Sequence, residues 1–523
     1  MADWVSPLAS TLSSSTSTSL VYAAALAAVA YVSLPSPQHR AVANLPRPKS
    51  TLPVVGNTID AMFTKRKKLH DWIYEECLRH QGKPFVIQIP GKPPMVVVST
   101  VEAVEDILKT QFDSFGKGAD FAAALEDVFG TGILASDGAK WHNQRKTASA
   151  LFSMSMMRDI MDDVMVEHTE RLCEIVGRSA QPGSEPLDIK HTLELYATDV
   201  FTKIGFGVDL HFLTSDNHEF FERFGRANHN LLYRNEQPTW LWQLKQALRL
   251  GVEKQQLEDV AWLDRFVYKI INDSIARRNQ GAAHTKHKDL VALCLDNPTM
   301  ASDEHGYDLK EIRDMAISFI SAGRDTTAYT MAWVMVMLAR YPSVQERIRQ
   351  EIRDRLPELA RKEIPAPRKD QVATLTYLEA VIKETLRLNA IIPLNTRATI
   401  EDVTLQDGTF LRAGTMILIP AYAMGRLPWI WGNDATEFKP ERWIDPATNE
   451  LVKVSPFKFI PFSAGPRICL GRQFSMMEMK IAISTLVSRF SFETTKDATE
   501  FAYDSSLVLG IDGPVLVRPT PVV

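Results

Sequence analysis

The chain has 523 residues, of which 45% are hydrophobic and 23% charged, and its formal net charge is −4 at pH 7. This balance, with no long run of one sign, is that of an ordinary globular protein and excludes the basic footprint of a nucleic-acid-binding protein. The four cysteines are widely spaced without a CxxC pair. That spacing argues against a disulfide framework or a structural zinc site and favours a reducing compartment.

A membrane anchor is the first element predicted in the chain. The uncharged run LVYAAALAAVAYVSL at residues 20–34 is followed by positive charge at Arg40 and Arg47. A spanning helix needs about 20 residues, so the run is short unless its Ser/Thr-rich flank is included. A cleaved signal peptide is the alternative, but it requires a basic residue before the apolar run, and none is present. We expect residues 1–40 to anchor the chain, with its body cytosolic, and the Pro-rich residues 41–57 to form a stiff hinge.

The body of the chain is predicted to be mainly helical with small sheets. PFVIQIPGKPPMVVVST, from Pro84, indicates two short strands followed by a helix that Ser99 or Thr100 caps. A second hairpin is expected over residues 403–419, because turn signals interrupt that segment. No internal repeat is visible, so a single domain over residues 58–523 is the simplest organisation. The 3.6-residue periodicity of apolar residues predicts helices over residues 158–176, 262–278, 310–339, 344–355, 377–388 and 473–490.

An unusual polar run, AGRDTT, lies at residues 322–327 within the longest predicted helix. Glycine, aspartate and threonine are poor choices for a helix interior. Thr326 can donate a hydrogen bond to the carbonyl of Ala322, and with Gly323 lacking a side chain the helix could open into a groove. Taken alone, a threonine that satisfies itself on its own helix backbone is the ordinary explanation.

A lone cysteine lies in a glycine-containing loop near the carboxyl end. Phe462, Gly465, Arg467, Cys469 and Gly471 form the pattern FxxGxRxCxG just ahead of a predicted helix. Glycines permit positive φ, so backbone N–H groups can point at the sulfur and, with the helix N-terminus, stabilise a thiolate. A buried apolar thiol is the usual state of a single cysteine, but this pattern resembles the heme-binding signature of the cytochrome P450 superfamily. The resemblance implies that Cys469 is the axial ligand of heme b, in a loop to which Phe462 and Gly471 belong.

Two other segments resemble motifs of the same superfamily, in the same order. The run at residues 322–327 resembles the oxygen-activation motif, which implies that Asp325 and Thr326 relay protons with ordered water. Glu384 and Arg387 lie three residues apart, on one helical face, and precede Arg442 in FKPERW. A solvated surface pair is the simple alternative, but the resemblance implies a buried triad that serves folding and heme incorporation.

The superfamily fold implied is mainly α, a single large helical domain with small β-sheets and the heme buried between two long helices. The two heme propionates need cationic partners. Trp141 and Arg145, four residues apart in WHNQR, match family positions that contact them, as do Arg397 in PLNTR and Arg467 in the cysteine loop. Each arginine taken alone would more often form a surface salt bridge.

Further segments narrow the expected substrate. FDSFGKGADF, GTGILASDGAKWHNQRKTASALFS, GFGVDL and EQPTWLWQLKQALRL resemble the branch that hydroxylates fatty acids and alkanes near the chain end. This implies NADPH- and O2-dependent insertion of one oxygen atom into an unactivated C–H bond, at the terminal or near-terminal carbon of long-chain fatty acids. Pro238, Trp240 and Trp242 are candidates for the membrane surface, where aromatic residues are favoured, and core packing explains them equally well. Terminal attack needs a narrow apolar channel, and candidates for its lining, each otherwise ordinary core, are Phe121, Leu125, Phe319, Ile392, Leu394, Leu507 and Val508.

Other functions remain open at this stage. Alkanes, sterols and xenobiotics are alternative monooxygenase substrates. A heme-thiolate isomerase or dehydratase needs no proton relay, so the intact Asp325 and Thr326 argue against it. A non-catalytic heme-binding sensor would keep Cys469 but would not need the oxygen motif or the anchor.

No built-in reductase is visible, because the two GxG runs at residues 116–118 and 205–207 lack the third glycine of a dinucleotide loop. The resemblance therefore implies a separate membrane-bound NADPH-dependent flavoprotein reductase. We expect it to dock near Lys146, Lys458 and Arg472, with the protein held in the endoplasmic reticulum membrane and its lipid bilayer.

Overall fold

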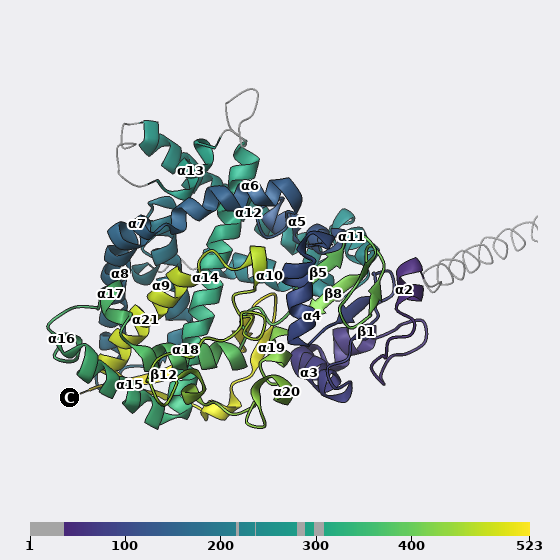
Figure 1. Ribbon diagram of the computed structural model, residues 1–523. Helices are drawn as coiled ribbons and strands as arrows, with labels where there is room; N and C mark the ends of the chain where they lie inside the picture. Colours follow the sequence, from purple (N-terminus) through teal and green to yellow (C-terminus); the bar gives the residue numbers. More distant parts are fainter. Residues whose placement is uncertain (1–35, 216–218, 236, 280–287, 298–307, 523) are drawn as a thin grey trace, which may run out of the picture.

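The computed structural model describes residues 36–215, 219–235, 237–279, 288–297 and 308–522 (Figure 1). The predicted anchor segment at residues 20–34 lies outside this range. Within the described ranges, no helix combines the length and the hydropathy needed to cross a membrane.

Helices make up most of the described chain, as predicted, and the longest of them, α14, runs through its centre (Figure 1). The side chain of Asp308 starts α14 by accepting hydrogen bonds from the backbone N–H groups of Lys310 and Glu311. The α-helices are α2 (Pro37–Ala41), α3 (Leu69–Arg79), α4 (Val101–Glu105), α5 (Ala119–Phe129), α6 (Gly138–Ser149), α7 (Met154–Met156), α8 (Asp162–Ser179), α9 (Ile189–Phe206), α10 (Glu219–Asn235), α11 (Thr239–Ala247), α12 (Gly251–Asn279), α13 (Leu290–Leu295), α14 (Leu309–Arg340), α15 (Pro342–Arg355), α16 (Pro357–Ala360), α17 (Lys369–Val372), α18 (Thr376–Leu388), α19 (Ala421–Met424), α20 (Pro428–Trp431) and α21 (Arg472–Arg489).

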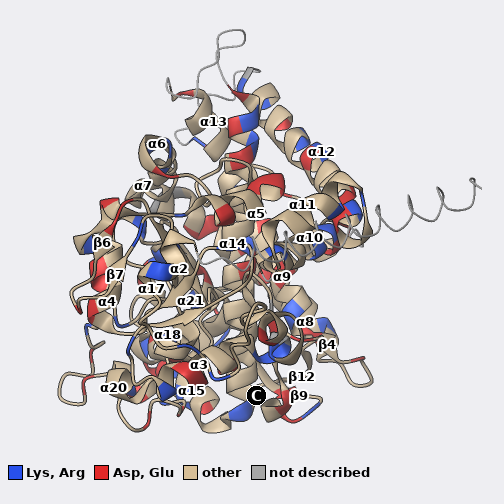
Figure 2. Ribbon diagram, turned by 90° about the vertical axis from the view of Figure 1, so that its right-hand side faces the viewer, with Lys and Arg blue, Asp and Glu red and all other residues tan. Residues whose placement is uncertain are grey.

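The six helices predicted from apolar periodicity are all present, as α8, α12, α14, α15, α18 and α21. In α12 the buried residues Leu263, Val267, Ile270 and Ile271 recur at helical spacing and lie on one side. Acidic and basic residues alternate along the rest of this helix (Figure 2). The prediction captured only the second half of α12, since its first half is rich in charged residues and shows little apolar periodicity.

The strands form one five-stranded sheet and three smaller sheets. In the larger sheet the order is β1-β2-β8-β5-β3. The first predicted hairpin is confirmed as the antiparallel pair β1 and β2, and Thr100 caps α4 behind it. The strands are β1 (Phe85–Ile87), β2 (Met95–Val97), β3 (Phe115–Gly116), β4 (Leu187–Asp188), β5 (Asn395–Thr399), β6 (Val403–Thr404), β7 (Phe410–Leu411), β8 (Met416–Ile419), β9 (Phe490–Thr494), β10 (Tyr503–Ser505), β11 (Leu509–Ile511) and β12 (Leu516–Pro521).

The hairpin predicted over residues 403–419 is wrong in its second half. Strands β6 and β7 pair with each other, but β8 pairs with β5 and runs parallel to β2. All four residues of β8 are buried. A continuous apolar run of this kind is typical of a central strand covered on both faces, and the turn residue Gly414 separates it from β7.

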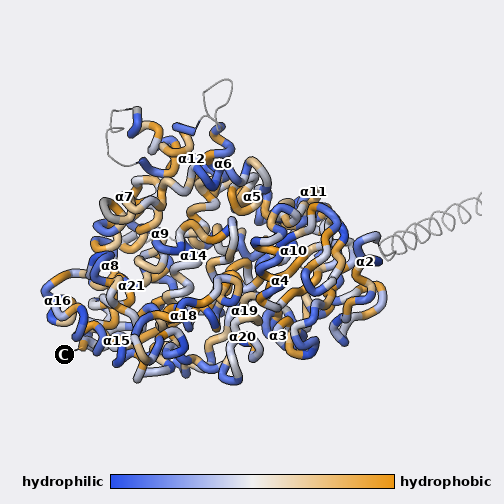
Figure 3. Tube along the Cα trace, in the orientation of Figure 1, coloured by the Kyte–Doolittle hydropathy of each residue, from blue (hydrophilic) through white to orange (hydrophobic). Residues whose placement is uncertain are grey.

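Two cores hold the molecule together. One is helical and gathers around α9, α14 and α21, and the other lies under the five-stranded sheet and α3. Figure 3 shows hydrophobic segments concentrated in the interior and hydrophilic segments mainly at the periphery.

Residues 41–57, the predicted hinge, lie against the sheet. The N–H of Val86 in β1 donates to the carbonyl of Pro46 at 2.9 Å, and the N–H of Asn57 donates to the carbonyl of Gln88 at 2.7 Å. Gly56 has a φ of +56°, and a Cβ at this position would lie 2.3 Å from the Gln88 oxygen. The segment is thus fixed to β1 and to the residue that follows it by two backbone hydrogen bonds.

Candidate active site

The cysteine loop connects a single turn of 3₁₀ helix to α21. The N–H of Cys469 donates to the carbonyl of Phe462 at 2.9 Å, which closes the loop. Gly465 allows a close approach to the neighbouring segment, because a Cβ there would lie 1.9 Å from the carbonyl oxygen of Leu108. Arg145 of α6 donates to the carbonyl of Ile468 at 2.7 Å. The loop is therefore fixed on both sides of the cysteine.

The Cys469 side chain has an exposed surface although the surrounding protein desolvates it. This desolvation raises the pKa of the thiol, whereas the N–H of Gly471 and the charges of Arg145 and Arg472 act in the opposite direction. These are the donors and cations that would stabilise a thiolate. Desolvation outweighs them, so the net pKa of the thiol lies above its ordinary value and the thiolate stays a prediction.

One aromatic ring separates this loop from α14. Phe152 stacks on Phe319 of α14 with ring centroids 6.2 Å apart, and a Cβ at Gly471 would lie 3.6 Å from the same ring. Most residues of α14 near Phe319 are buried, but Ala322 is exposed and Thr326 is half-buried. The polar run and the cysteine loop therefore present accessible surface within the same part of the molecule.

Thr326 donates to the carbonyl of Ala322 at 2.6 Å, as predicted. The groove expected at Gly323 is absent, because α14 is a continuous α-helix from Leu309 to Arg340. A Cβ at Gly323 would lie 2.1 Å from the ring of Phe201. The glycine thus permits α9 to pack closely on α14, a tertiary contact that the local sequence pattern did not reveal.

Asp325 is buried beside an arginine that the sequence reasoning did not single out. The Nε of Arg324 lies 3.1 Å from Oδ1 of Asp325, and Nδ2 of Asn228 in α10 donates to Oδ2 at 3.2 Å. Burial raises the pKa of Asp325 to about 6, an effect that the Arg324 charge opposes. A carboxyl group with this pKa can exchange protons near neutral pH.

Arg324 is itself enclosed by α9 and α10. Its guanidinium lies 4.7 Å from the ring centroid of Phe221 and 5.2 Å from that of Phe224. Glu194 of α9 is 4.0 Å away. The buried cation thus has two carboxylates and two aromatic rings near it, and their charges and ring faces offset the cost of its burial.

A cluster of cations lies near the cysteine loop. Arg397 of β5 is 3% exposed and its side chain has one hydrogen bond, to the carbonyl of Thr396 at 2.7 Å. Burial and the nearby charge of Arg467 lower the pKa of Arg397 to about 10. Burial together with Arg397 and Arg467 also holds the pKa of Lys117 well below its ordinary value. Among the described residues, the one carboxylate that offsets these three charges is Asp137, which forms an ion pair with Arg467.

Trp141 supports this cluster from α6. Its ring lies 4.2 Å from the Arg467 guanidinium and 5.7 Å from that of Arg145. A pocket of about 350 Å³ opens beside it, with Asp137 and Ile400 among its walls. Sequence reasoning missed Lys117, although it stands within the FDSFGKGADF segment, because an isolated lysine carries no motif of its own.

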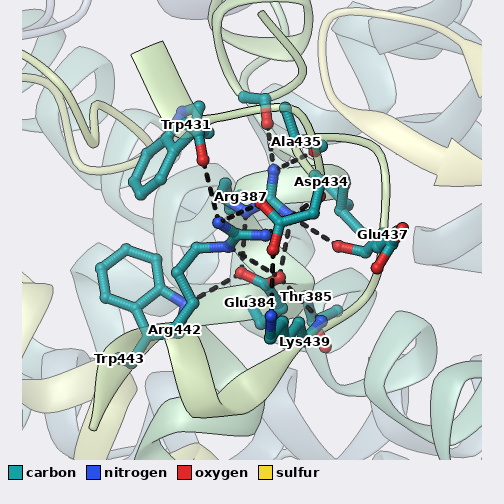
Figure 4. Close-up of polar contacts among 12 residues, drawn as sticks. Glu384, Thr385, Arg387, Trp431, Asp434, Ala435, Glu437, Lys439, Arg442 and Trp443 are labelled. Atoms are coloured by element: carbon teal, nitrogen blue, oxygen red, sulfur yellow. Dashed lines mark hydrogen bonds and ion pairs between the residues drawn. The ribbon is translucent and has the colours of Figure 1, made fainter. Parts of the chain in front are cut away.

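The predicted triad is connected as expected, with Glu384 and Arg387 buried and Arg442 partly exposed (Figure 4). Arg387 binds Glu384 through two hydrogen bonds of 2.7 Å, and both side chains are fully buried. Nε of Arg442 lies 3.4 Å from Glu384, and Nε1 of Trp443 donates to the same carboxylate at 2.9 Å. Arg387 also donates to the carbonyls of Gly425, Ala435 and Glu437, which lie in the segment after α19. The triad thus joins α18 to the chain that leads toward the cysteine loop.

Comparison with known proteins identifies the family. The family model for Cytochrome P450 matches residues 46–517. This chain belongs to the cytochrome P450 family. Among its relatives, cytochrome P450 CYP94D108 of Paris polyphylla is 35% identical over 81% of this chain and 83% of the relative. Cytochrome P450 704B1 of Arabidopsis thaliana is 31% identical over 84% and 89%, and cytochrome P450 94A1 of Vicia sativa is 29% identical over 84% of each chain.

As a P450 the protein is a monooxygenase, and the cofactor of the family is heme, iron protoporphyrin IX. The residues present fit this group. A thiol with an exposed surface is available as a soft ligand. Nearby, Lys117, Arg397 and Arg467 carry more positive charge than Asp137 balances, and the buried Nε of Arg467 has no hydrogen-bond partner among the described residues. Such a cluster suits two propionate groups.

The residues expected to line a substrate channel in this P450 differ in burial. Leu125 and Phe319 are buried in the helical core, at 1% and 5% exposure. The other five are partly open: Phe121, Ile392, Leu394, Leu507 and Val508. Trp242 is also buried, at 4% exposure, under the guanidinium of Arg234, so core packing and not a membrane surface accounts for it. Trp240 is 53% exposed.

Proposed function

We propose that this P450 inserts one atom of O2 into the terminal or near-terminal C–H bond of a long-chain fatty acid. The observation that carries the proposal is a group of partly open apolar side chains from three distant segments. Phe121 belongs to α5, Ile392 and Leu394 follow α18, and Leu507 and Val508 form the turn between β10 and β11. An unbranched acyl chain is the substrate class that such walls fit.

Contacts between these segments support their common orientation. The N–H of Leu509 donates to the carbonyl of Ile391 at 2.7 Å, which joins the β10–β11 turn to the segment after α18. Nε1 of Trp333 in α14 donates to the carbonyl of Leu509 at 3.2 Å. A Cβ at Gly118, at the start of α5, would lie 2.6 Å from that of Ala398 in β5. All three segments are thus tied to neighbours of α14 or of β5.

In the proposed mechanism Cys469 would hold the heme iron through its sulfur. Arg145, Arg397 and Arg467, together with Trp141, would bind the propionates, and Phe462 and Gly471 shape the loop. When bound, the heme supplies the oxygen-activating chemistry, which a thiolate ligand promotes. The protein orients the substrate and excludes bulk water.

Proton supply is assigned to the two polar residues of α14. Asp325, with a pKa near 6, takes a proton from the solvent side and passes it toward Thr326. The Thr326 hydroxyl is held by the carbonyl of Ala322 and is half-buried, so it can hand a proton to the substrate side through ordered water. The triad of Glu384, Arg387 and Arg442 has a structural role and contacts no reacting atom in this mechanism.

We also propose that residues 1–40 anchor the protein in the endoplasmic reticulum membrane, that residues 41–57 connect the anchor, and that residues 58–523 form the catalytic domain. Exposed apolar side chains of the described chain support contact with a lipid bilayer. Val54 and Phe63 are 60% and 72% exposed. Trp240 and Leu244 of α11 are 53% and 49% exposed, and the Trp240 ring approaches Gly91 in the β1–β2 turn.

P450 enzymes generally take electrons from a redox partner and act on a small molecule with O2. For this chain we propose a membrane-bound NADPH-dependent flavoprotein reductase that docks near the cysteine loop. Lys146 and Arg472 are exposed, and the Lys458 ammonium lies 4.6 Å from the ring of Trp431. Reversal of these charges to glutamate should slow electron transfer, more strongly at low salt than at high salt. An unchanged rate would remove this docking site.

The substrate proposal is tested by spectral titration of the purified ferric protein with dodecanoic acid, dodecane and cholesterol. A saturable shift with dodecanoic acid is expected, and a Leu507→Trp variant should weaken it because the larger ring fills the channel. Val452→Trp, at an exposed apolar residue outside the channel, is the matched control. A response to cholesterol alone would retain the monooxygenase and reject the fatty acid.

A further inference from the structure

A half-buried carboxylate joins α3 to the β10–β11 hairpin near the carboxyl end of the chain. Asp71 of α3 accepts hydrogen bonds from the hydroxyl of Tyr422 at 2.8 Å and from the hydroxyl of Tyr503 at 3.2 Å. The backbone N–H of Asp71 donates in turn to the Tyr503 oxygen at 3.3 Å. Tyr503 therefore makes two hydrogen bonds to one residue that is 432 positions away in the sequence.

The neighbours of this contact are tightly packed. His70 is 2% exposed, and its ring centroid lies 5.8 Å from that of Tyr422 and 5.4 Å from that of Tyr503. The two tyrosine rings meet edge to face at 5.5 Å. The guanidinium of Arg426 lies 3.6 Å from the Tyr422 ring and gives the Asp71 carboxylate a nearby cation. The rings would keep this packing if a hydroxyl alone were removed.

Tyr503 begins the hairpin whose turn carries two of the candidate channel residues. Strands β10 and β11 pair from Tyr503 opposite Ile511 to Ser505 opposite Leu509, and Leu507 and Val508 lie in the turn between them. Strand β11 is held through Leu509, which bonds to Ile391 and to Trp333 of α14. Strand β10 is held at its first residue, Tyr503, by Asp71. The position of the turn thus depends on α14 on one side and on α3 on the other.

We propose that Asp71 and Tyr503 are positioning residues that set which carbon of the substrate is oxidised. The proposal rests on the proposed function, since it assumes an acyl chain against Leu507 and Val508. With the hydrogen bonds in place, the turn is fixed and only the chain end reaches the reacting centre. When these hydrogen bonds are lost, β10 can shift and the turn moves away from the substrate. Internal carbons of the acyl chain can then reach the reacting centre.

A purely stabilising role is the alternative for this cluster. It would make every variant less stable without altering which product forms. Because the hairpin is held independently at Leu509, loss of the Tyr503 hydroxyl should change the place of the turn more than the stability of the whole protein. The product ratio therefore separates the two roles.

The test compares Tyr503→Phe and Asp71→Asn with Tyr377→Phe in the full-length enzyme supplied with its reductase and dodecanoic acid. Tyr377 is the matched control, because its hydroxyl also donates to a carboxylate, that of Glu441 at 3.4 Å, but far from the hairpin. We expect the ratio of terminal to internal hydroxylation to fall about threefold or more in Tyr503→Phe, since an ionic hydrogen bond is lost. An unchanged ratio in that variant, or an equal fall in Tyr377→Phe, would overturn the proposal.

Hydrogen–deuterium exchange provides a readout that needs no substrate. Amides of residues 503–511 should exchange faster in Tyr503→Phe than in the parent or in Tyr377→Phe, and unchanged exchange would overturn the proposal. If the parent enzyme fails to hydroxylate dodecanoic acid, the fatty acid assignment is rejected, and the exchange data alone decide whether Asp71 fixes the turn. The reduced-CO spectrum of each variant shows that the compared proteins are folded.

Discussion

The Nε of Arg324 lies 3.1 Å from Oδ1 of Asp325, inside a shell made by α9, α10 and α14. Burial raises the pKa of Asp325 to about 6, compared with about 3.9 for an ordinary aspartate. Between these two values the folded protein holds a proton that the unfolded chain has released. This group therefore favours the folded state at low pH, and its contribution is lost as the pH rises through 6.

The pKa of Asp325 should control the pH dependence of coupled turnover. Nδ2 of Asn228 donates to Asp325 and lowers this pKa. We expect Asn228→Leu to raise the pKa further and to move the pH profile of product formed per NADPH toward higher pH. Asn230→Leu is the control, because Asn230 is equally buried on α10 but donates to Glu253. Identical profiles in the two variants would show that Asp325 does not set the pH dependence.

Replacement of Thr326 by alanine should uncouple NADPH oxidation from hydroxylation. The variant loses a hydroxyl beside Asp325 without a change in helix packing, so we expect NADPH consumption to continue with peroxide as the main product. Thr330→Ala is a close control, since Thr330 also donates to a carbonyl four residues earlier at 2.6 Å but is 3% exposed. Fully coupled turnover in Thr326→Ala would exclude the proton relay.

Replacement of Cys469 by serine should abolish the reduced-CO absorption typical of a thiolate ligand. A hydroxyl is a poor ligand for a heme iron that selects a soft thiolate. The measurement is the absorption difference spectrum of the reduced protein with and without CO. Cys294→Ser should keep the spectrum, because Cys294 is 1% exposed in the helical core. Persistence of the thiolate spectrum in Cys469→Ser would show that another cysteine binds the iron.

Local patterns in the sequence predicted the helices and the triad well. In α18 the apolar residues recur with helical period, and Glu384 and Arg387 lie on one face whatever the rest of the fold does. The prediction of a groove at Gly323 was wrong, because the outcome there depends on a distant residue and not on the local pattern. Whether a missing side chain opens a groove or admits a neighbour depends on Phe201, which is more than a hundred residues away in the chain.

Long-range contacts of this kind also explain the residues that were missed. Arg324 was read as part of a motif, but its role as the partner of Asp325 requires the aromatic rings of α10 around it. Lys117 joins Arg397 and Arg467 only because β3 pairs with β5. Pairing between strands far apart in sequence cannot be read from a single chain, and it also placed β8 in the central sheet.

Removal of the Arg387 charge should destabilise the protein strongly. Arg387 and Glu384 are both fully buried, so Arg387→Met leaves the Glu384 carboxylate with Arg442 at 3.4 Å as its remaining cation and several carbonyls of residues 425–437 without their donor. Loss of one member of a buried ion pair costs about 3 to 5 kcal/mol. We expect a decrease of this size in the free energy of unfolding, measured by urea denaturation followed by tryptophan fluorescence, and a lower heme content of the purified protein.

Arg347→Met provides the comparison for this prediction. Arg347 forms an ion pair with Glu441 at the surface, and its side chain is 50% exposed. An exposed pair of this kind contributes about 0 to 1 kcal/mol, because water screens it and the side chains lose entropy when they pair. Equal losses in the two variants would mean that burial of the triad adds nothing to stability. A large loss in Arg387→Met with normal heme content would separate its structural role from heme incorporation.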